Sequence, residues 1–174
     1  AYIYNSIVFL ALTFENEVAV LENLTVNYYG SLSVNINTLN VEIRESYVMG
    51  WSIISRSSQI EIIDSSIDTI HAFYNSQIAI RNSAVSTFRI THNSTASIFG
   101  SDISSIFASG SSHTLVRGSR ISILYAIGGA KVELRGSRLG YLIGLGTNAE
   151  VNISRSVVKG VFCLLYTSPS PRDR

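Results

Sequence analysis

Two copies of the tetrapeptide Arg-Gly-Ser-Arg, at residues 117–120 and 135–138, carry the clearest candidate chemistry in the sequence. Guanidinium groups bind phosphate, sulfate and carboxylate groups through paired hydrogen bonds. The repeat places four such groups at matching points: Arg117, Arg120, Arg135 and Arg138. We expect these arginines to form a two-by-two array, and one hypothesis is that the array binds phosphate, sulfate or carboxylate groups of a glycan or lipid. The alternative is that they are surface arginines that keep the protein soluble.

The distribution of charge favours a local basic patch over a nucleic-acid-binding surface. Residues 111–162 contain seven basic and two acidic residues, whereas residues 1–110 contain four basic and nine acidic residues. Lys131, Arg155 and Lys159 can extend the arginine array. Because positive and negative charges balance over residues 1–162, we do not expect the chain to bind nucleic acid.

The acidic residues form a second candidate cluster, at Glu42, Glu45, Glu61 and Asp64. A step of 19 residues separates the first two from the last two, so like charges are expected to stack and to repel each other. A cation such as Ca²⁺, or the side chains of Arg44 and Arg81, could relieve that repulsion. A carboxylate pair of the glycosidase type is another interpretation, and a solvated acidic face without a ligand is the simplest one.

Serine repeats more regularly than any other residue type, and this regularity argues against serine catalysis. It occupies one position in eight segments: Ser6, Ser46, Ser65, Ser83, Ser101, Ser119, Ser137 and Ser156. A nucleophilic serine requires a neighbouring base, and none recurs beside this position. We expect these serines to point inward and to hydrogen-bond to the backbone or to the next serine. His71, His92 and His113 fall at three different positions of the repeat, so no metal-binding histidine column is expected.

All of these residues are set in a repeat of about 18 residues that runs through most of the chain. Apolar residues within a segment are spaced by two, which is typical of strands, and spacings of three are expected to mark corners. Segments that cannot bury an apolar face alone stack as a solenoid. The sequence therefore predicts an all-β protein, a single-stranded parallel β-helix of about nine coils.

The residue before each repeated serine predicts the backbone conformation of one corner. That position holds Asn5, Glu45, Asp64, Asn82, Gly100, Gly118 and Gly136. Gly and Asn, and then Asp, tolerate a left-handed backbone better than other residues do. We expect a left-handed residue at this corner in every coil.

The segment from Asn75 to Ser112, NSQIAIRNSAVSTFRITHNSTASIFGSDISSIFASGSS, resembles right-handed parallel β-helix proteins of the pectin-lyase-like superfamily. Within that superfamily it is most similar to the Ser/Asn-rich repeats of large secreted or cell-surface proteins of archaea and bacteria. The resemblance covers residues 1–162 and implies right-handed coils and an extracellular or cell-surface location. The superfamily includes lyases, hydrolases, adhesins and surface-layer components, so the resemblance is specific for fold and not for activity.

The expected function is a non-catalytic structural or adhesive segment of a larger secreted or cell-envelope protein. One alternative is a lyase or glycoside hydrolase acting on polysaccharide, with catalytic residues partly outside this chain. The other is an anionic-glycan-binding module that uses the arginine array. Polysaccharide or cell-envelope components are the expected partners, and no cofactor is expected apart from the Ca²⁺ considered above. Phe107 and Tyr125 are expected to stack on the outside, where they could contact sugars or a neighbouring segment.

The two ends of the chain differ from its middle. Ser6 and Val8 fit the repeat, so we interpret the opening segment as a coil and the chain as part of a longer protein. Residues 163–174, CLLYTSPSPRDR, interrupt the repeat and resemble translated sequencing-adapter read-through; the alternative is a genuine disordered tail. We therefore argue no disulfide or thiol chemistry from Cys163. No apolar run reaches 18 residues, so no transmembrane helix is expected. Both ends of a solenoid expose strand edges, which predicts end-to-end association.

Overall fold

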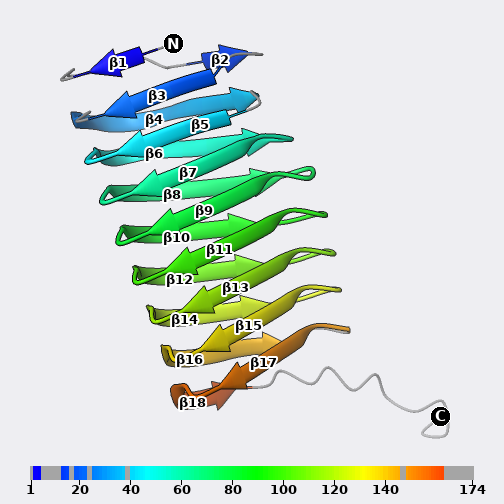
Figure 1. The fold of residues 1–174 in the computed structure, drawn as a ribbon. Helices are drawn as coiled ribbons and strands as arrows, with labels where there is room; N and C mark the ends of the chain where they lie inside the picture. Colours follow the sequence, from blue (N-terminus) through cyan, green and yellow to red (C-terminus); the bar gives the residue numbers. More distant parts are fainter. Residues whose placement is uncertain are drawn as a thin grey trace, which may run out of the picture.

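The chain winds into a parallel β-solenoid in a computed structural model, which describes residues 2–4, 13–15, 18–22, 25–37, 40–145 and 148–162. The regular secondary structure in these ranges consists of β-strands alone, and successive strands alternate between two sheets (Figure 1). Each strand pairs in parallel with the strand two places later in the sequence, as β11 does with β13. The expected fold class, an all-β parallel β-solenoid, is confirmed.

The strands of the two sheets follow each other in strict alternation. Sheet A contains β1 (Tyr2–Tyr4), β3 (Val18–Glu22), β5 (Asn40–Arg44), β7 (Gln59–Ile63), β9 (Gln77–Arg81), β11 (Thr95–Phe99), β13 (His113–Arg117), β15 (Lys131–Arg135) and β17 (Glu150–Ser154). Sheet B contains β2 (Thr13–Glu15), β4 (Thr25–Asn37), β6 (Tyr47–Arg56), β8 (Ser66–Phe73), β10 (Ala84–Ile90), β12 (Asp102–Ala108), β14 (Arg120–Ala126), β16 (Arg138–Leu145) and β18 (Val157–Phe162).

The 18-residue period becomes the register between neighbouring coils. On sheet A, Ile62 lies opposite Ile80, and on sheet B, Val85 lies opposite Ile103. The predicted apolar columns are all buried: Ile60, Ile78, Ala96, Thr114, Val132; Ile62, Ile80, Ile98, Val116, Leu134; Ile67, Val85, Ile103, Ile121, Leu139; and Ile70, Phe88, Ile106, Leu124, Leu142. Burying one such aliphatic side chain stabilises the fold by about 1.5–3 kcal/mol, and here each is buried mainly by the coils on either side.

The expected number of coils is too high. The solenoid has about six turns rather than nine. Among the residues whose burial is described, the core includes Val41 on β5, Leu142 on β16 and the coils between them. Nearer the N-terminus the period is not kept: β4 is 13 residues long, and its pairing with β6 shifts register between Asn27 and Leu32. Matching a few positions of the repeat therefore overestimates how many coils close around a core.

The corner that follows each strand of sheet A, which we call the first corner, has the predicted left-handed residue. The φ angles are positive at Glu45, Asp64, Asn82, Gly100, Gly118 and Gly136, from 46° to 58°. Arg155 continues the column with a φ of 50°, although its residue type gave no sign of this. Asn5 lies outside the described residues. From Glu45 to Gly136, the amide of each corner residue donates to a carbonyl of the next coil, as Gly118 does to Arg135 at 3.1 Å.

The repeated serines form a ladder of hydrogen bonds inside the first corner. The backbone N–H of Ser83 donates to Oγ of Ser101, whose own N–H donates to Oγ of Ser119, at 3.2 and 3.1 Å. Each Oγ also donates to the carbonyl two residues earlier, as Ser101 does to Phe99 at 2.8 Å. The same pattern continues to Ser156, and the serines from Ser46 to Ser137 are buried. The structural role expected for the serines is confirmed from Ser46 to Ser156, and Ser6 lies outside the described residues.

Each coil has a second place where inward residues are three positions apart, as Ile103 and Ile106 are. Contrary to expectation, this spacing does not mark a corner. Ile103 and Ile106 both point into the core, yet they belong to one strand, β12. The strand bends at the two residues between them, and the pairing with β14 skips Ser104. Each regular coil consequently has two corners. The second corner follows each strand of sheet B and leads back to sheet A.

Candidate functional site

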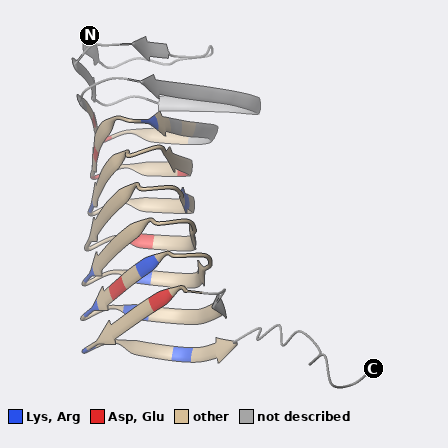
Figure 2. Ribbon diagram, turned by 90° about the vertical axis from the view of Figure 1, so that its right-hand side faces the viewer, with Lys and Arg blue, Asp and Glu red and all other residues tan. Residues whose placement is uncertain are grey.

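The four-arginine array keeps its register but is divided between two sheets. Arg117 lies opposite Arg135 at the ends of β13 and β15, on sheet A. Arg120 lies opposite Arg138 at the starts of β14 and β16, on sheet B. The first corner turns the chain between these pairs. Arg120 and Arg138 line one hollow, and Arg135 lines another. Figure 2 shows basic residues recurring along the edge of the ribbon where sheet A turns into sheet B.

The two arginines on sheet A already have partners within the protein. A terminal nitrogen of Arg135 donates to Glu133 at 2.8 Å. The guanidinium carbon of Arg117 lies 6.0 Å from the ring centroid of Phe99, and that of Arg81, on the other neighbouring coil, lies 5.9 Å away. These are cation–π distances, so Phe99 separates two cations of one column. Arg135 also lines a shallow hollow with Asn152 and Ser154.

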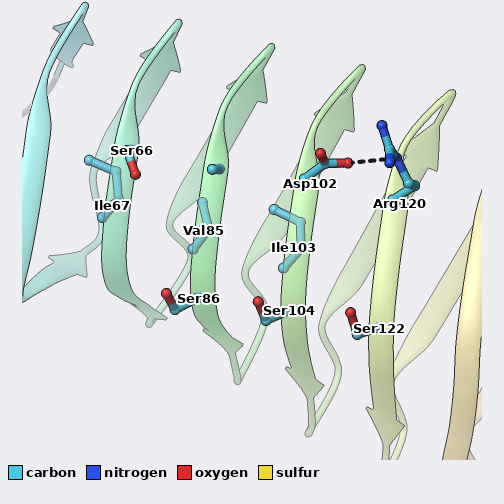
Figure 3. A pocket seen from close by; sticks show the side chains of 10 residues that line it. Ser66, Ile67, Val85, Ser86, Asp102, Ile103, Ser104, Arg120 and Ser122 are labelled. Carbon is cyan, nitrogen blue, oxygen red and sulfur yellow. Dashed lines mark ion pairs between the residues drawn. The ribbon is translucent and has the colours of Figure 1, made fainter.

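The two arginines on sheet B line a groove that crosses successive strands of this sheet near the bend in each one. Figure 3 shows the part over β8 to β14, where Ser86, Ser104 and Ser122 recur on successive strands. This part encloses about 360 Å³. One ion pair crosses it, from Nε of Arg120 to Oδ1 of Asp102 at 3.1 Å. Both side chains of that pair are largely exposed, so the pair itself stabilises the fold little.

A second hollow, of about 520 Å³, continues the groove toward the C-terminal coils. It shares Arg120 and Ser122 with the first hollow and adds Arg138, Tyr141 and Lys159. We call the two hollows together the sheet B groove, lined by Ser66, Ile67, Ala84, Val85, Ser86, Asp102, Ile103, Ser104, Arg120, Ile121, Ser122, Ile123, Arg138, Leu139, Gly140, Tyr141, Val157 and Lys159. It runs along the rod axis across successive coils.

The backbone of Gly140, which lines the groove, lies close to the backbone of the preceding coil. A Cβ atom at this position would lie 2.4 Å from the carbonyl oxygen of Ser122, far inside contact distance. No larger residue fits here without moving the strand, so the close approach of these two coils requires glycine. Tyr141, beside it, covers Gly160 of the next coil and remains 45% exposed.

The acidic cluster stacks as expected, and arginines lie against it. Glu42 is opposite Glu61 in the pairing of β5 with β7. Glu42 pairs with Arg44, and Glu61 pairs with Nε of Arg81 at 3.1 Å. Glu45 and Asp64 both occupy the left-handed position of the first corner. Within the described ranges no three His, Cys, Asp or Glu side chains come together as metal ligands.

The outward aromatic residues Phe107 and Tyr125 stack on each other, so their ring faces contact side chains of the protein itself. Phe107 and Tyr125 are stacked with centroids 4.5 Å apart and an interplanar angle of 3°. Arg89 lies 5.2 Å from the centroid of Phe107 on the preceding coil. A sugar stacks on the face of an aromatic ring, and both faces of Phe107 have neighbours along the column. The sugar contact considered for this pair therefore lacks an open face on Phe107.

The three histidines lie apart, as their different positions in the repeat predict. His71 is opposite Arg89 on sheet B, His92 lies 4.4 Å from the ring of Tyr74, and His113 lies 3.8 Å from Glu133. Burial lowers the pKa of His71, and the charge of Arg89 lowers it further. His71 is therefore mainly neutral at pH 7 and lies beside an arginine.

Comparison with family models, with curated proteins and with solved structures finds no match to this chain. Among the described residues, no helix is long and apolar enough to cross a membrane.

Sequence reasoning found the cations of the groove but not their grouping. The register correctly aligned Arg120 with Arg138. It also grouped them with Arg117 and Arg135, because it did not reveal that the first corner sends each pair to a different sheet. The sequence indicated Lys159 only as an extension of the array, and it did not link Tyr141 to these cations. The signal that unites them is the spacing of 18 to 21 residues between outward positions of sheet B.

Proposed function

We propose that the chain is a rigid, non-catalytic β-solenoid segment with a structural or adhesive role in a larger secreted or cell-envelope protein. We also propose right-handed coiling, which is the usual hand of parallel crossovers, and kinship with the pectin-lyase-like superfamily. The partners are polysaccharide or other envelope components at the cell surface.

The observation that carries the proposal is the continuity of the serine ladder. From Ser46 to Ser156 each first corner is tied to the next by a hydrogen bond between a backbone N–H and a serine Oγ. One such bond contributes about 0.5–1.5 kcal/mol, but the ladder repeats it at every coil. A ladder of this kind fixes the rise and twist between coils, and this is the property that a spacer requires.

The polysaccharide-cleaving alternative has less support from the geometry. A glycosidase requires two carboxyl groups that flank the scissile bond. The stacked pair Glu42 and Glu61 is engaged with Arg44 and Arg81. Asp102, in the sheet B groove, is paired with Arg120.

The rigidity can be measured between two labels at the ends of one outward column. Six coil steps separate Arg44 from Ser154, and both side chains are exposed. Six steps at strand spacing correspond to about 29 Å between the backbones. Spin labels on Arg44→Cys and Ser154→Cys, in a chain with Cys163→Ser, should give one narrow distance distribution near that value. A broad distribution would contradict a rigid segment.

The non-catalytic part of the proposal has its own test. The chain is incubated with polygalacturonate and with neutral polysaccharides, and reducing ends and unsaturated products are measured over time. We expect none above the level without protein. Products that disappear in the double variant Glu42→Gln, Glu61→Gln would instead support the enzymatic alternative.

A further inference from the structure

The sheet B groove changes in character along the rod. Over β8 to β12 its lining is neutral apart from Asp102 and includes the hydroxyl groups of Ser66, Ser86 and Ser104. Over β14 to β18 it is lined by three cations and no acid. The groove therefore offers hydroxyl groups at one end and positive charge at the other.

The cations at the basic end are available to a ligand. Neither Arg138 nor Lys159 takes part in an ion pair within the described part of the chain. Arg120 uses Nε to bind Asp102, which leaves its two terminal nitrogens for other acceptors. Three side chains thus bring donors to one hollow of about 520 Å³.

The number and arrangement of these donors indicate the class of anion. A carboxylate is satisfied by a single arginine, which binds both of its oxygens side by side. Three cations around one hollow suit a group with at least three acceptor oxygens, such as a sulfate ester. Because the groove is open along the axis, the group can belong to a chain that extends over several coils.

We propose that the basic end of the sheet B groove binds a sulfate ester of a linear sulfated glycan. Arg120, Arg138 and Lys159 hold the ester, and the glycan continues along the serine-lined part of the groove. The exposed ring of Tyr141 forms one wall of the hollow in which the ester lies. Arg117 and Arg135, on sheet A, take no part.

This inference goes beyond the proposed rod. A rigid segment could exist with an empty groove, so a failure to bind glycan leaves the label-distance result untouched. A flexible chain would contradict the rod whether or not it binds glycan.

The test compares two pairs of charge-neutralising substitutions. The groove variant is Arg138→Gln with Lys159→Gln, and the control variant is Arg117→Gln with Arg155→Gln. Each removes two positive charges from the C-terminal coils, but only the first touches the groove. Binding of dextran sulfate is measured by titration calorimetry, and circular dichroism with thermal melting checks that each variant keeps the fold of the unaltered chain.

We expect the groove variant to bind dextran sulfate roughly 10- to 100-fold more weakly, because it loses charge-assisted hydrogen bonds. The control variant should lose no more than a few-fold, through the general field alone. Equal losses in the two variants would overturn the proposal, as would an unaltered chain that fails to bind dextran sulfate.

A third variant should strengthen binding. Asp102→Asn removes the only acid of the groove and frees Nε of Arg120, so dextran sulfate should bind several-fold more tightly. Unchanged or weaker binding contradicts the role of Arg120.

Competing ligands separate the classes of anion. Unsulfated dextran should not bind, and polygalacturonate or a soluble polyphosphate should bind more weakly than dextran sulfate of equal charge. Polygalacturonate or polyphosphate that binds equally well, with the same loss in the groove variant, would show that the groove does not select sulfate esters and would overturn that part of the proposal.

Discussion

The two corners of each coil solve the same problem in different ways. At the first corner the left-handed residues Gly118 and Gly136 are open to solvent, with no atom within 4 Å of where a Cβ would lie. Inside that corner every buried serine is hydrogen-bonded to its neighbours. At the second corner the backbones of successive coils approach closely, and a Cβ on Gly110 would lie 3.0 Å from the backbone nitrogen of His92.

The buried serines of the second corner form a ladder that stops. Ser76 donates its N–H to Oγ of Ser94 at 3.2 Å, as in the first corner. The column continues with Ser112 and then Ala130, which has no hydroxyl group, and the buried Oγ of Ser112 has no hydrogen-bond partner. Serine hydroxyl groups thus tie the coils together along the whole first corner. At the second corner the serine ladder stops, and backbone hydrogen bonds, such as Ile127 N–H to Ala108 at 3.0 Å, act together with close backbone packing. Substitutions at corresponding places should therefore have different effects.

The largest difference is expected between two glycines in the left-handed conformation. Gly118→Ala should destabilise the protein by about 1–2 kcal/mol, the cost of placing a Cβ in that conformation. Gly110→Ala carries the same cost and adds about 1–3 kcal/mol for crowding against the backbone of His92. Urea unfolding monitored by circular dichroism measures both values.

Asparagine at the same two positions provides the control. Asn82 already occupies the left-handed position of the first corner, so Gly118→Asn should cost less than Gly118→Ala. Gly110→Asn should stay as destabilising as Gly110→Ala, because the crowding remains. Equal effects of alanine at Gly110 and Gly118 would mean that the second corner is not held by close packing.

A second, smaller difference is expected between one serine of each corner. Ser101→Ala leaves the buried N–H of Ser83 without its acceptor, so the free energy of unfolding should fall by about 1–3 kcal/mol. Ser112→Ala removes a buried hydroxyl group that has no partner, and should be neutral or slightly stabilising. The two substitutions remove the same atom, which makes them matched controls. A loss at Ser112 as large as at Ser101 would show that the hydroxyl of Ser112 is hydrogen-bonded in solution.

The first corner could be predicted from the sequence because its physical requirements restrict residue type. A left-handed backbone favours Gly and Asn, and a tight inward position favours Ser, so the two columns are visible without a structure. The second corner shows no such pattern. Its left-handed positions hold residues as different as Tyr74, His92 and Gly128, and its serine column stops at Ala130.

The candidate site was less predictable, because it depends on which sheet the backbone enters after each turn. A spacing of three residues separates Arg117 from Arg120 across a corner, and the same spacing separates Ile103 from Ile106 within a bent strand. The chain passes from sheet A to sheet B between the two arginines, but it stays in one strand between the two isoleucines. The spacing alone does not distinguish these cases. Where outward side chains gather could therefore be read only from the path of the backbone.

The smallest expected effect concerns the aromatic residues near the second corner, where His71 lies 5.7 Å from the ring of Phe73. Because the pKa of His71 is lowered in the folded protein, the unfolded chain binds its proton more readily. The contribution to stability is complete above about pH 6.5, the ordinary value for histidine, and is lost as the pH falls from there through the lowered pKa. His71→Gln should flatten the dependence of the unfolding midpoint on pH in that window. Ser101→Ala, at the first corner, should lower the midpoint by the same amount at every pH in the window, because it removes no titrating group. If the unfolding midpoint of His71→Gln still depended on pH as strongly, a group other than His71 would make the fold sensitive to pH.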